Sequence, residues 1–212
     1  MRNGYFITFE GGEGSGKSTQ IALVRESLEQ AGIPVCVTRE PGGTELAEEI
    51  RGVLLEPRAE IVDVNTELLL IFAARAQHLA QCIRPALARG EWVLCDRFTD
   101  ATYAYQHGGR GLDVSTIATL EQLVQAGFSP DMTLLFDAPI DITLQRMRNR
   151  GALDRFEREG RAFMEGVRAT YLSRAQSEAD RFRVIDATGS IEAVNAAVKE
   201  HLKRLVDRWR VS

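Results

Sequence analysis

The chain has 212 residues, 44% of them hydrophobic and 26% charged, and a formal net charge of −4. These values predict one α/β domain over residues 1–212, and the acidic balance disfavours a general nucleic-acid-binding protein, whose surface is basic. The longest apolar run, residues 68–74, is far shorter than the ~18 residues of a membrane span, and the first strand begins too early for a signal peptide, so we expect a cytoplasmic protein with no nucleic-acid or membrane partner.

A strand, a glycine-rich loop and a helix open the chain. Residues 5–9 are β-branched and aromatic, and residues 19–30 carry apolar side chains at helical spacing. The loop between them fits Gly, four residues, Gly-Lys-Ser/Thr, in which glycines and a helix N-terminus direct N–H groups at phosphates. Chance alone could also place a glycine turn before a lysine. We predict a nucleotide-binding loop made of Gly11, Gly12, Glu13, Gly14, Ser15, Gly16, Lys17, Ser18 and Thr19.

The residue types in and near this loop predict ATP and Mg²⁺ as ligands. Lys17 can reach the β- and γ-phosphates, and the Ser18 hydroxyl can bind Mg²⁺. Asp96 ends the apolar run 91–96, where an acid often holds a magnesium-bound water, although a helix N-cap would explain it as well. Glu13 is unusual beside phosphates and more plausibly faces a hydroxyl of a second substrate.

The rest of the chain alternates strands with helices. Strands are predicted at 34–38, 91–96, 131–137 and 182–186, and helices at 45–55, 66–81, 113–125, 140–150, 163–179 and 191–209. Pro85 is expected to kink or restart the helix at 66–81. This order predicts a five-stranded parallel sheet flanked by helices, whose ligands bind beyond the carboxyl ends of the strands. The glycine loop, residues 39–41 and residues 96–97 all follow strand ends.

Two further stretches have both a structural and a functional interpretation. Residues 146–161 contain six arginines, which form either a solvated helix face or a lid that closes over a transferring phosphoryl group. Residues 98–106 offer hydroxyls, an amide and aromatic rings, which suit either a planar base or a half-buried helix. Arg97, directly before them, can grip a phosphate with two hydrogen bonds.

With these motifs in place, the chain resembles the thymidylate kinases over essentially its whole length. The similarity rests on residues 9–19, 38–44, 96–98 with 104–106 and 109–111, and 146–157. It implies a P-loop nucleoside-monophosphate-kinase-like fold that phosphorylates dTMP to dTDP with Mg-ATP, in dTTP biosynthesis, as a homodimer. Because Gly14 follows Glu13 where other members have an arginine, it implies the bacterial type, with catalytic arginines in a lid over about 146–161.

The resemblance also implies individual roles. Glu13 would face the 3′-hydroxyl side of dTMP, Arg97 its phosphate, Arg75 and Gln106 its base, and Tyr105 would exclude a 2′-hydroxyl. A stacking Phe is common where this chain has Ile71, so Phe72 is expected to stack instead. A thymine-contacting Ser is common where this chain has Ala101, so the neighbouring Thr102 is expected to make that hydrogen bond. The implied catalytic residues are Lys17, Arg97, Arg148, Arg150 and Arg155; the substrate-binding residues are Glu13, Arg39, Pro41, Phe72, Arg75, Arg97, Thr102, Tyr105 and Gln106; the metal-binding residues are Ser18 and Asp96.

Two alternatives compete with this interpretation. One is a kinase for another nucleoside monophosphate. The other is a GTPase-type switch, because residues 186–189 match Asp-x-x-Gly, although no Asn-Lys-x-Asp motif exists. Separately, the cysteines Cys36, Cys82 and Cys95 are widely spaced with no CxxC pair, which predicts buried, reduced thiols rather than a disulfide framework or a zinc site.

Overall fold

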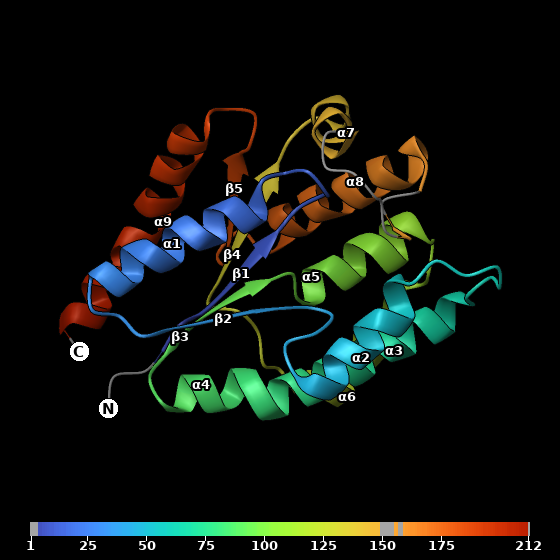
Figure 1. Cartoon of the computed structure of the whole chain (residues 1–212), viewed down its shortest axis with the longest axis horizontal. Coiled ribbons are helices and arrows are strands. Elements are labelled where there is room, and N and C mark those ends of the chain that lie inside the picture. Colours follow the sequence, from blue (N-terminus) through green and yellow to red (C-terminus); the bar gives the residue numbers. More distant parts are fainter. Residues whose placement is uncertain (1–3, 149–154, 157–158, 212) are drawn as a thin grey trace.

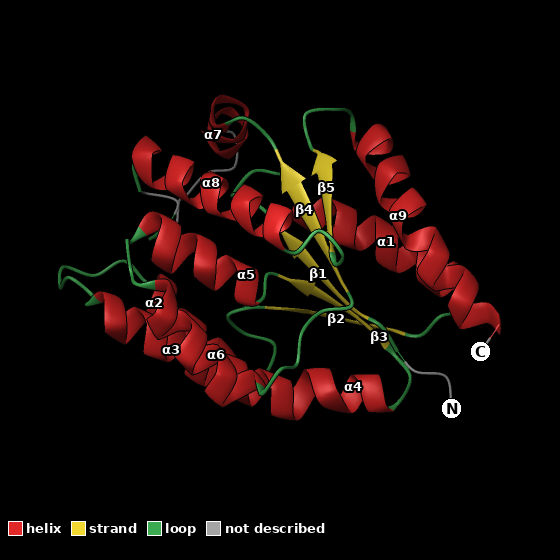
Figure 2. Ribbon diagram, turned by 180° about the vertical axis from the view of Figure 1, so that it is seen from behind, coloured by secondary structure: helices red, strands yellow, loops and turns green. Residues whose placement is uncertain are grey.

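A five-stranded sheet forms the centre of the computed structural model, which describes residues 4–148, 155–156 and 159–211 (Figures 1 and 2). The strand order is β2-β3-β1-β4-β5, and every paired strand is parallel, as predicted. The strands are β1 (Phe6–Glu10), β2 (Val35–Arg39), β3 (Trp92–Asp96), β4 (Met132–Asp137) and β5 (Phe182–Asp186).

Helices cover both faces of this sheet. They are α1 (Lys17–Gln30), α2 (Glu45–Leu55), α3 (Val64–His78), the π-helical η1 (Leu79–Ile83), α4 (Arg84–Ala88), α5 (Thr99–Thr102), the π-helical η2 (Tyr103–Gly109), α6 (Val114–Gln125), α7 (Ile140–Arg148), α8 (Arg161–Ser177) and α9 (Ile191–Val211). Helices α1 and α9 lie side by side on one face, and α4, α5 and α8 cover the other (Figures 1 and 2).

The alternation of side chains along β1 explains the two-sided core. Ile7 and Phe9 point toward α1 and α9, whereas Phe6 packs on the other face against Leu79 and Phe98. All five β1 residues are buried, as expected for a central strand of a parallel sheet. The register pairs Phe9 with Asp96, so the segments that follow β1 and β3 emerge at the same edge.

The predicted kink or restart at Pro85 takes a specific form. The chain passes from α3 through η1 into α4 without a loop, and the wider winding of η1 lies just before Pro85. Because proline lacks an N–H and crowds the preceding turn, a wider turn at that point lets the helix continue. The start at Val64 is earlier than predicted because Asp63 caps the N–H groups of Asn65 and Thr66 at 2.9 and 3.3 Å.

No helix within the described ranges is long and apolar enough to cross a membrane.

Candidate active site

The loop between β1 and α1 has the backbone of a phosphate cradle. Gly11, Gly14 and Gly16 have φ angles of 136°, 73° and 90°, a region that glycine enters without steric cost. Such turns let successive N–H groups face one side, next to the positive end of α1. The buried Lys17 ammonium donates to the carbonyl oxygens of Gly11 at 3.0 Å and Gly12 at 2.9 Å. The side chain of Lys17, the predicted phosphate-binding lysine, therefore folds back onto the glycine loop.

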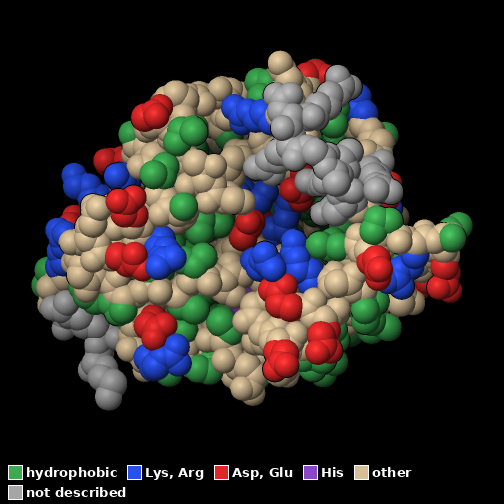
Figure 3. Space-filling view, viewed as in Figure 1, with side chains coloured by type: hydrophobic (Ala, Val, Ile, Leu, Met, Phe, Trp, Pro, Cys, Tyr) green, Lys and Arg blue, Asp and Glu red, His purple; other side chains and the backbone are tan. Residues whose placement is uncertain are grey.

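A polar pocket of about 250 Å³, here called the loop pocket, borders this cradle. Its lining carries four basic and three acidic side chains, a balance that attracts a polyphosphate. In the space-filling view, basic and acidic side chains gather in a hollow near the middle of the molecule (Figure 3). The lining residues are Glu13, Gly14, Gly16, Lys17, Ser18, Arg39, Glu40, Arg51, Asp96 and Arg97.

Asp96 and Ser18 fit a magnesium site in the loop pocket. Asp96 Oδ1 is buried and has no hydrogen-bond partner among the described residues, and a buried carboxylate oxygen normally has one. The N-cap of α5 is Phe98, so Asp96 does not cap that helix and the N-cap interpretation is wrong. One carboxylate and one hydroxyl suit Mg²⁺, an ion held largely by water and phosphates.

A second cavity, here called the inner cavity, adjoins the loop pocket. It lies between α2, α3 and the α5–η2 segment, and four residues line both spaces: Glu13, Glu40, Arg51 and Arg97. Two ligands bound in these spaces would therefore meet at shared side chains. The lining residues are Glu13, Glu40, Pro41, Arg51, Leu54, Leu55, Ile71, Arg75, Arg97, Phe98, Ala101, Thr102, Tyr105, Gln106 and Phe156.

Arg75 is held in the wall of the inner cavity with one donor left over. Its Nε donates to Glu40 Oε2 at 2.7 Å and its Nη2 to Thr102 Oγ1 at 2.9 Å. Its Nη1 is buried without a hydrogen-bond partner among the described residues. Since buried donors are rarely left unpaired, this atom is suited to a carbonyl oxygen of a bound ligand. Arg75 and Thr102 thus lie where the sequence predicts substrate contacts.

Phe72 does not line the inner cavity, so the expectation that it stacks on a bound base is wrong for this structure. Ile71 lines the cavity instead, and Phe72 packs in a buried cluster with Leu68, Tyr103 and Ile117. Helical spacing placed both residues on the same broad side of α3. The packing of α3 against α6 and η2 decides which of them reaches the cavity.

The junction of the two spaces is occupied by an ion pair between Arg97 and Glu13. Arg97 Nη1 also donates to the Gly11 carbonyl at 3.0 Å, and its guanidinium carbon lies 4.8 Å from the centre of the Tyr105 ring. Burial by itself raises the pKa of Glu13, but Arg97 and Lys17 outweigh it and lower that pKa to about 2. Glu13 is therefore ionised and faces the inner cavity and the loop pocket alike.

The Arg97 backbone is fixed in an uncommon conformation. Its φ of 70° is rare for a residue other than glycine, and its N–H donates to the Phe9 carbonyl at 3.0 Å. Behind it, the buried Glu10 accepts hydrogen bonds from the Phe98 N–H at 2.6 Å and the Tyr171 hydroxyl at 2.7 Å. Burial, together with the Asp100 charge, raises the pKa of Glu10 to about 8.

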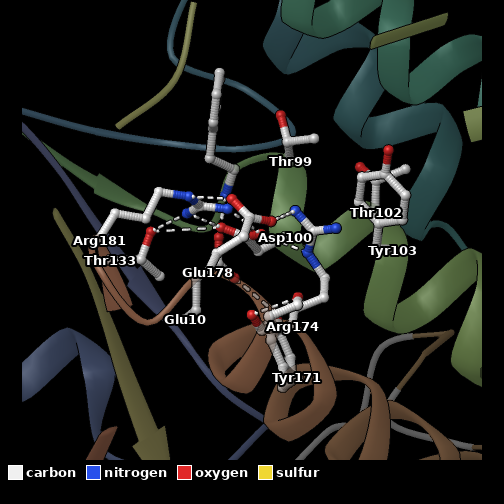
Figure 4. A network of polar contacts seen from close by, with 12 residues as sticks. Glu10, Thr99, Asp100, Thr102, Tyr103, Thr133, Tyr171, Arg174, Glu178 and Arg181 are labelled. Atoms are coloured by element: carbon white, nitrogen blue, oxygen red, sulfur yellow. Dashed lines mark hydrogen bonds and ion pairs between the residues drawn. The ribbon is translucent and has the colours of Figure 1, made fainter. Parts of the chain in front are cut away.

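A buried carboxylate, Asp100, ties the start of α5 to α8 and β4 (Figure 4). It accepts hydrogen bonds from Arg174 Nε at 2.6 Å and from Arg181 Nη1 at 2.7 Å. Arg181 also donates to Thr133 on β4 at 2.6 Å. Burial raises the pKa of Asp100, but the two arginines outweigh it and lower that pKa. The network anchors the helix that carries Ala101 and Thr102 into the inner cavity.

Arg155 bonds to the backbone of Leu54 in the wall of the inner cavity, but its own side chain lines neither that cavity nor the loop pocket. Its Nη2 donates to the buried Glu67 Oε2 at 2.5 Å, and its Nε donates to the Leu54 carbonyl at 2.9 Å. Glu67 Oε1 also accepts from Gln106 Nε2 at 2.9 Å. The expectation that Arg155 contacts the transferring phosphoryl group is therefore not met in this structure, because Glu67 holds its guanidinium.

Residues 146–161 were predicted to form either a solvated helix face or a lid over the phosphoryl group, and their other described arginines do not all follow one of these interpretations. Arg146 Nη1 donates to the Ala187 carbonyl at 2.9 Å and approaches the Gly14 carbonyl at 3.5 Å, so it contacts the glycine loop. Arg161 is exposed and forms surface ion pairs. Arg148 ends α7, and Arg150 lies outside the described residues.

Arg39 lines the loop pocket but not the inner cavity, so its predicted place among the dTMP contacts is not supported. It ends β2, and its guanidinium donates to Glu48 at 2.8 Å. The next residue, Glu40, lines both the loop pocket and the inner cavity. Pro41 also lines that cavity, and the peptide bond before it is cis.

Sequence reasoning missed several residues of the site. Arg51, Leu54 and Leu55 line the inner cavity from α2, and Arg51 Nη1 donates to the Pro41 carbonyl at 2.8 Å. The Thr44 cap predicted the helix at residues 45–55 but did not predict that the helix forms a cavity wall. His107, after the predicted substrate contact Gln106, has its Nδ1 2.7 Å from the Leu112 carbonyl oxygen.

Comparison with known proteins agrees with this geometry. The thymidylate kinase family model matches residues 9–198. The chain is 58% identical over 208 residues to a thymidylate kinase of Pseudomonas putida, covering 98% of this chain and 99% of the relative. It is 58% identical over 211 residues to one of Chromohalobacter salexigens, covering 99% and 100%. A crystal structure of thymidylate kinase from Ehrlichia chaffeensis superposes with a TM-score of 0.76 at 35% identity, covering 95% of this chain and 99% of that one. This chain therefore belongs to the thymidylate kinase family.

Proposed function

We propose that this chain transfers the γ-phosphoryl group of ATP to dTMP, forming dTDP for dTTP synthesis. The observation that carries the proposal is the pair of adjoining spaces that share Glu13, Glu40, Arg51 and Arg97. The loop pocket suits the donor, because its glycine loop and its basic side chains match a triphosphate. The inner cavity suits a nucleoside monophosphate whose phosphate lies at the junction.

The donor side needs positioning and charge neutralisation more than covalent chemistry. Lys17 and the loop N–H groups would bind the β- and γ-phosphates, and Ser18 and Asp96 would hold Mg²⁺, which neutralises charge on the donor phosphates. The attacking atom is a phosphate oxygen of dTMP, already ionised at neutral pH, so no general base is required. Arg97, which touches both spaces, would orient that phosphate.

The acceptor side is proposed to recognise thymine by its polar edge. Arg75 Nη1 would donate to a base carbonyl, with Thr102 and Gln106 on the same wall. Ile71 would supply the apolar contact that the sequence assigns to Phe72. Tyr105, whose hydroxyl donates to Glu13 at 3.3 Å, would limit the space beside the sugar, and Glu13 would face the 3′-hydroxyl.

Family membership supports three further proposals. Arg148 and Arg150 would contact the transferring phosphoryl group from a lid. The enzyme would be located in the cytoplasm and would be a homodimer. Size-exclusion chromatography with light scattering tests the dimer, and a monomer at assay concentration would contradict it.

The decisive experiment measures ADP formation from Mg-ATP with dTMP, dUMP, dCMP, AMP, GMP or no acceptor. Turnover that depends on dTMP is expected. A preference for another nucleotide would favour the alternative of a different monophosphate kinase. Equal rates without any acceptor would favour an ATPase or a nucleotide-dependent switch.

A further inference from the structure

Two cysteines meet at the edge of the sheet that β2 forms. Cys36 lies on β2 and Cys82 in η1, and their sulfur atoms are 3.9 Å apart. Both side chains are half-buried rather than buried, so the prediction of buried thiols is wrong for this pair. Cys82 also lines a solvent-open cavity of about 730 Å³, which gives a small oxidant access to its sulfur.

A histidine supported by a carboxylate adjoins this pair. His78 lies one helical turn before Cys82; its Nδ1 is 3.0 Å from Glu40 Oε1, and its Nε2 is 2.6 Å from Thr38 Oγ1. The Cys36 thiol and the neighbouring His78 ring lower the pKa of the Cys82 thiol. Burial by itself lowers the pKa of His78, but Cys82 and Glu40 outweigh it and raise that pKa to about 9. A thiol beside a charged imidazole is the arrangement that makes cysteines reactive.

We propose that Cys36 and Cys82 form a reversible oxidation site for hydrogen peroxide, with Cys82 as the attacking thiolate and Cys36 as the resolving thiol. In the first step the Cys82 sulfur attacks one peroxide oxygen, the O–O bond breaks, and the departing hydroxide takes a proton to become water, leaving a sulfenic acid. In the second step the Cys36 sulfur attacks the Cys82 sulfur, the S–O bond breaks, and a second water leaves. Two thiols are oxidised to one disulfide while one peroxide is reduced to two waters.

The geometry suits both steps. A disulfide needs about 2.05 Å between sulfurs, so the pair must close by roughly 2 Å. Cys82 lies in a π-helical segment, whose winding is already irregular and which adjusts more readily than a regular α-helix. The site also connects to substrate binding, because Glu40 bonds both His78 and Arg75.

Cys95 provides an internal comparison within the same chain. Its side chain is fully buried, and burial raises the pKa of its thiol. Its Sγ donates to the Arg97 carbonyl at 3.0 Å. We therefore expect Cys95 to resist peroxide under conditions that oxidise the pair.

The test treats the reduced full-length protein with a small excess of hydrogen peroxide and maps cysteine-linked peptides by mass spectrometry without reduction. An intramolecular Cys36–Cys82 link is expected, released by dithiothreitol and formed equally in Cys95→Ser. Cys36→Ser should instead accumulate a sulfenic acid on Cys82 that dimedone traps. Cys82→Ser should lower the rate of peroxide consumption by about tenfold or more, since the thiolate is the nucleophile. Thermal melting shows that each variant is folded.

Three outcomes would overturn the proposal: peroxide consumption in Cys82→Ser equal to that of the parent, dimedone labelling of Cys95 in Cys36→Ser, or a link that forms only between two chains. Because both substitutions replace sulfur with oxygen, folded variants are expected. If one variant fails to fold, mapping the Cys36–Cys82 link in the unsubstituted protein still tests the proposal.

Discussion

Arg155 and Glu67 form a charged hydrogen bond of 2.5 Å next to the inner cavity, and Glu67 is 1% exposed. The same carboxylate accepts a hydrogen bond from Gln106, a proposed base contact. One buried acid thus joins Arg155 to Gln106, which lines the inner cavity. We therefore expect Arg155 to affect acceptor binding rather than phosphoryl transfer.

Arg155→Ala is accordingly expected to raise the KM for dTMP by roughly tenfold, with a smaller change in kcat, because a hydrogen bond to a charged group contributes about 1.5 kcal/mol. Steady-state kinetics with varied dTMP measures this. Arg161→Ala, in an exposed arginine of the same stretch, is the matched control and should behave as the parent. A large fall in kcat at unchanged KM would return Arg155 to the catalytic role that the resemblance implies.

Lys17→Ala is expected to lower kcat by about a hundredfold or more, because it removes a positive charge placed against the transferring phosphates. The fold should persist, since the lysine bonds only to its own loop and not to the core. Lys199→Ala, exposed on α9, serves as the control. Turnover near that of the parent would contradict the phosphate-loop assignment.

Arg97→Ala is expected to impair dTMP use more than ATP binding. Arg97 lies where the loop pocket and the inner cavity meet, and Lys17 is still present to bind the phosphates of ATP. The KM for dTMP from kinetics is compared with the affinity for ATP from calorimetry. The change also leaves Glu13 without its main partner, so burial should raise the pKa of that carboxyl. If ATP affinity alone fell, Arg97 would belong to the donor side.

Whether a structural feature could be predicted depends on how far apart in the sequence its interacting residues lie. The glycine loop and the five strands are local patterns, and the structure places them as predicted. The pairs Tyr171–Glu10 and Arg155–Glu67 join residues 161 and 88 positions apart, and no local pattern reveals them. The choice between Ile71 and Phe72 failed for a related reason. These residues lie four and three positions before Arg75, both spacings bring a side chain close to it on a helix, and only tertiary packing decides which one reaches the cavity.

Asp100→Asn is expected to destabilise the protein by about 3–5 kcal/mol, because it leaves two arginines partly buried beside a neutral side chain. Urea unfolding followed by circular dichroism gives the free energy of unfolding. Asp180 is an exposed acid directly before Arg181 in the sequence. The control Asp180→Asn should change the free energy of unfolding by less than about 0.5 kcal/mol. Equal stabilities for the two variants would show that the network of Figure 4 contributes little.

Glu10 should make stability depend on pH in a direction that can be worked out. Its pKa is about 8 in the folded chain and 4.5 as its ordinary value, so the folded state holds a proton that the unfolded state loses. The unfolded chain therefore binds fewer protons between about pH 5 and about pH 8, and stability falls as pH rises through that window. Glu10→Gln removes this titration, so its free energy of unfolding should decline less over the same range. Glu49→Gln, at an exposed position on α2, should keep the slope of the parent. A Glu10→Gln slope equal to that of the parent would mean that Glu10 is ionised in the folded protein at neutral pH.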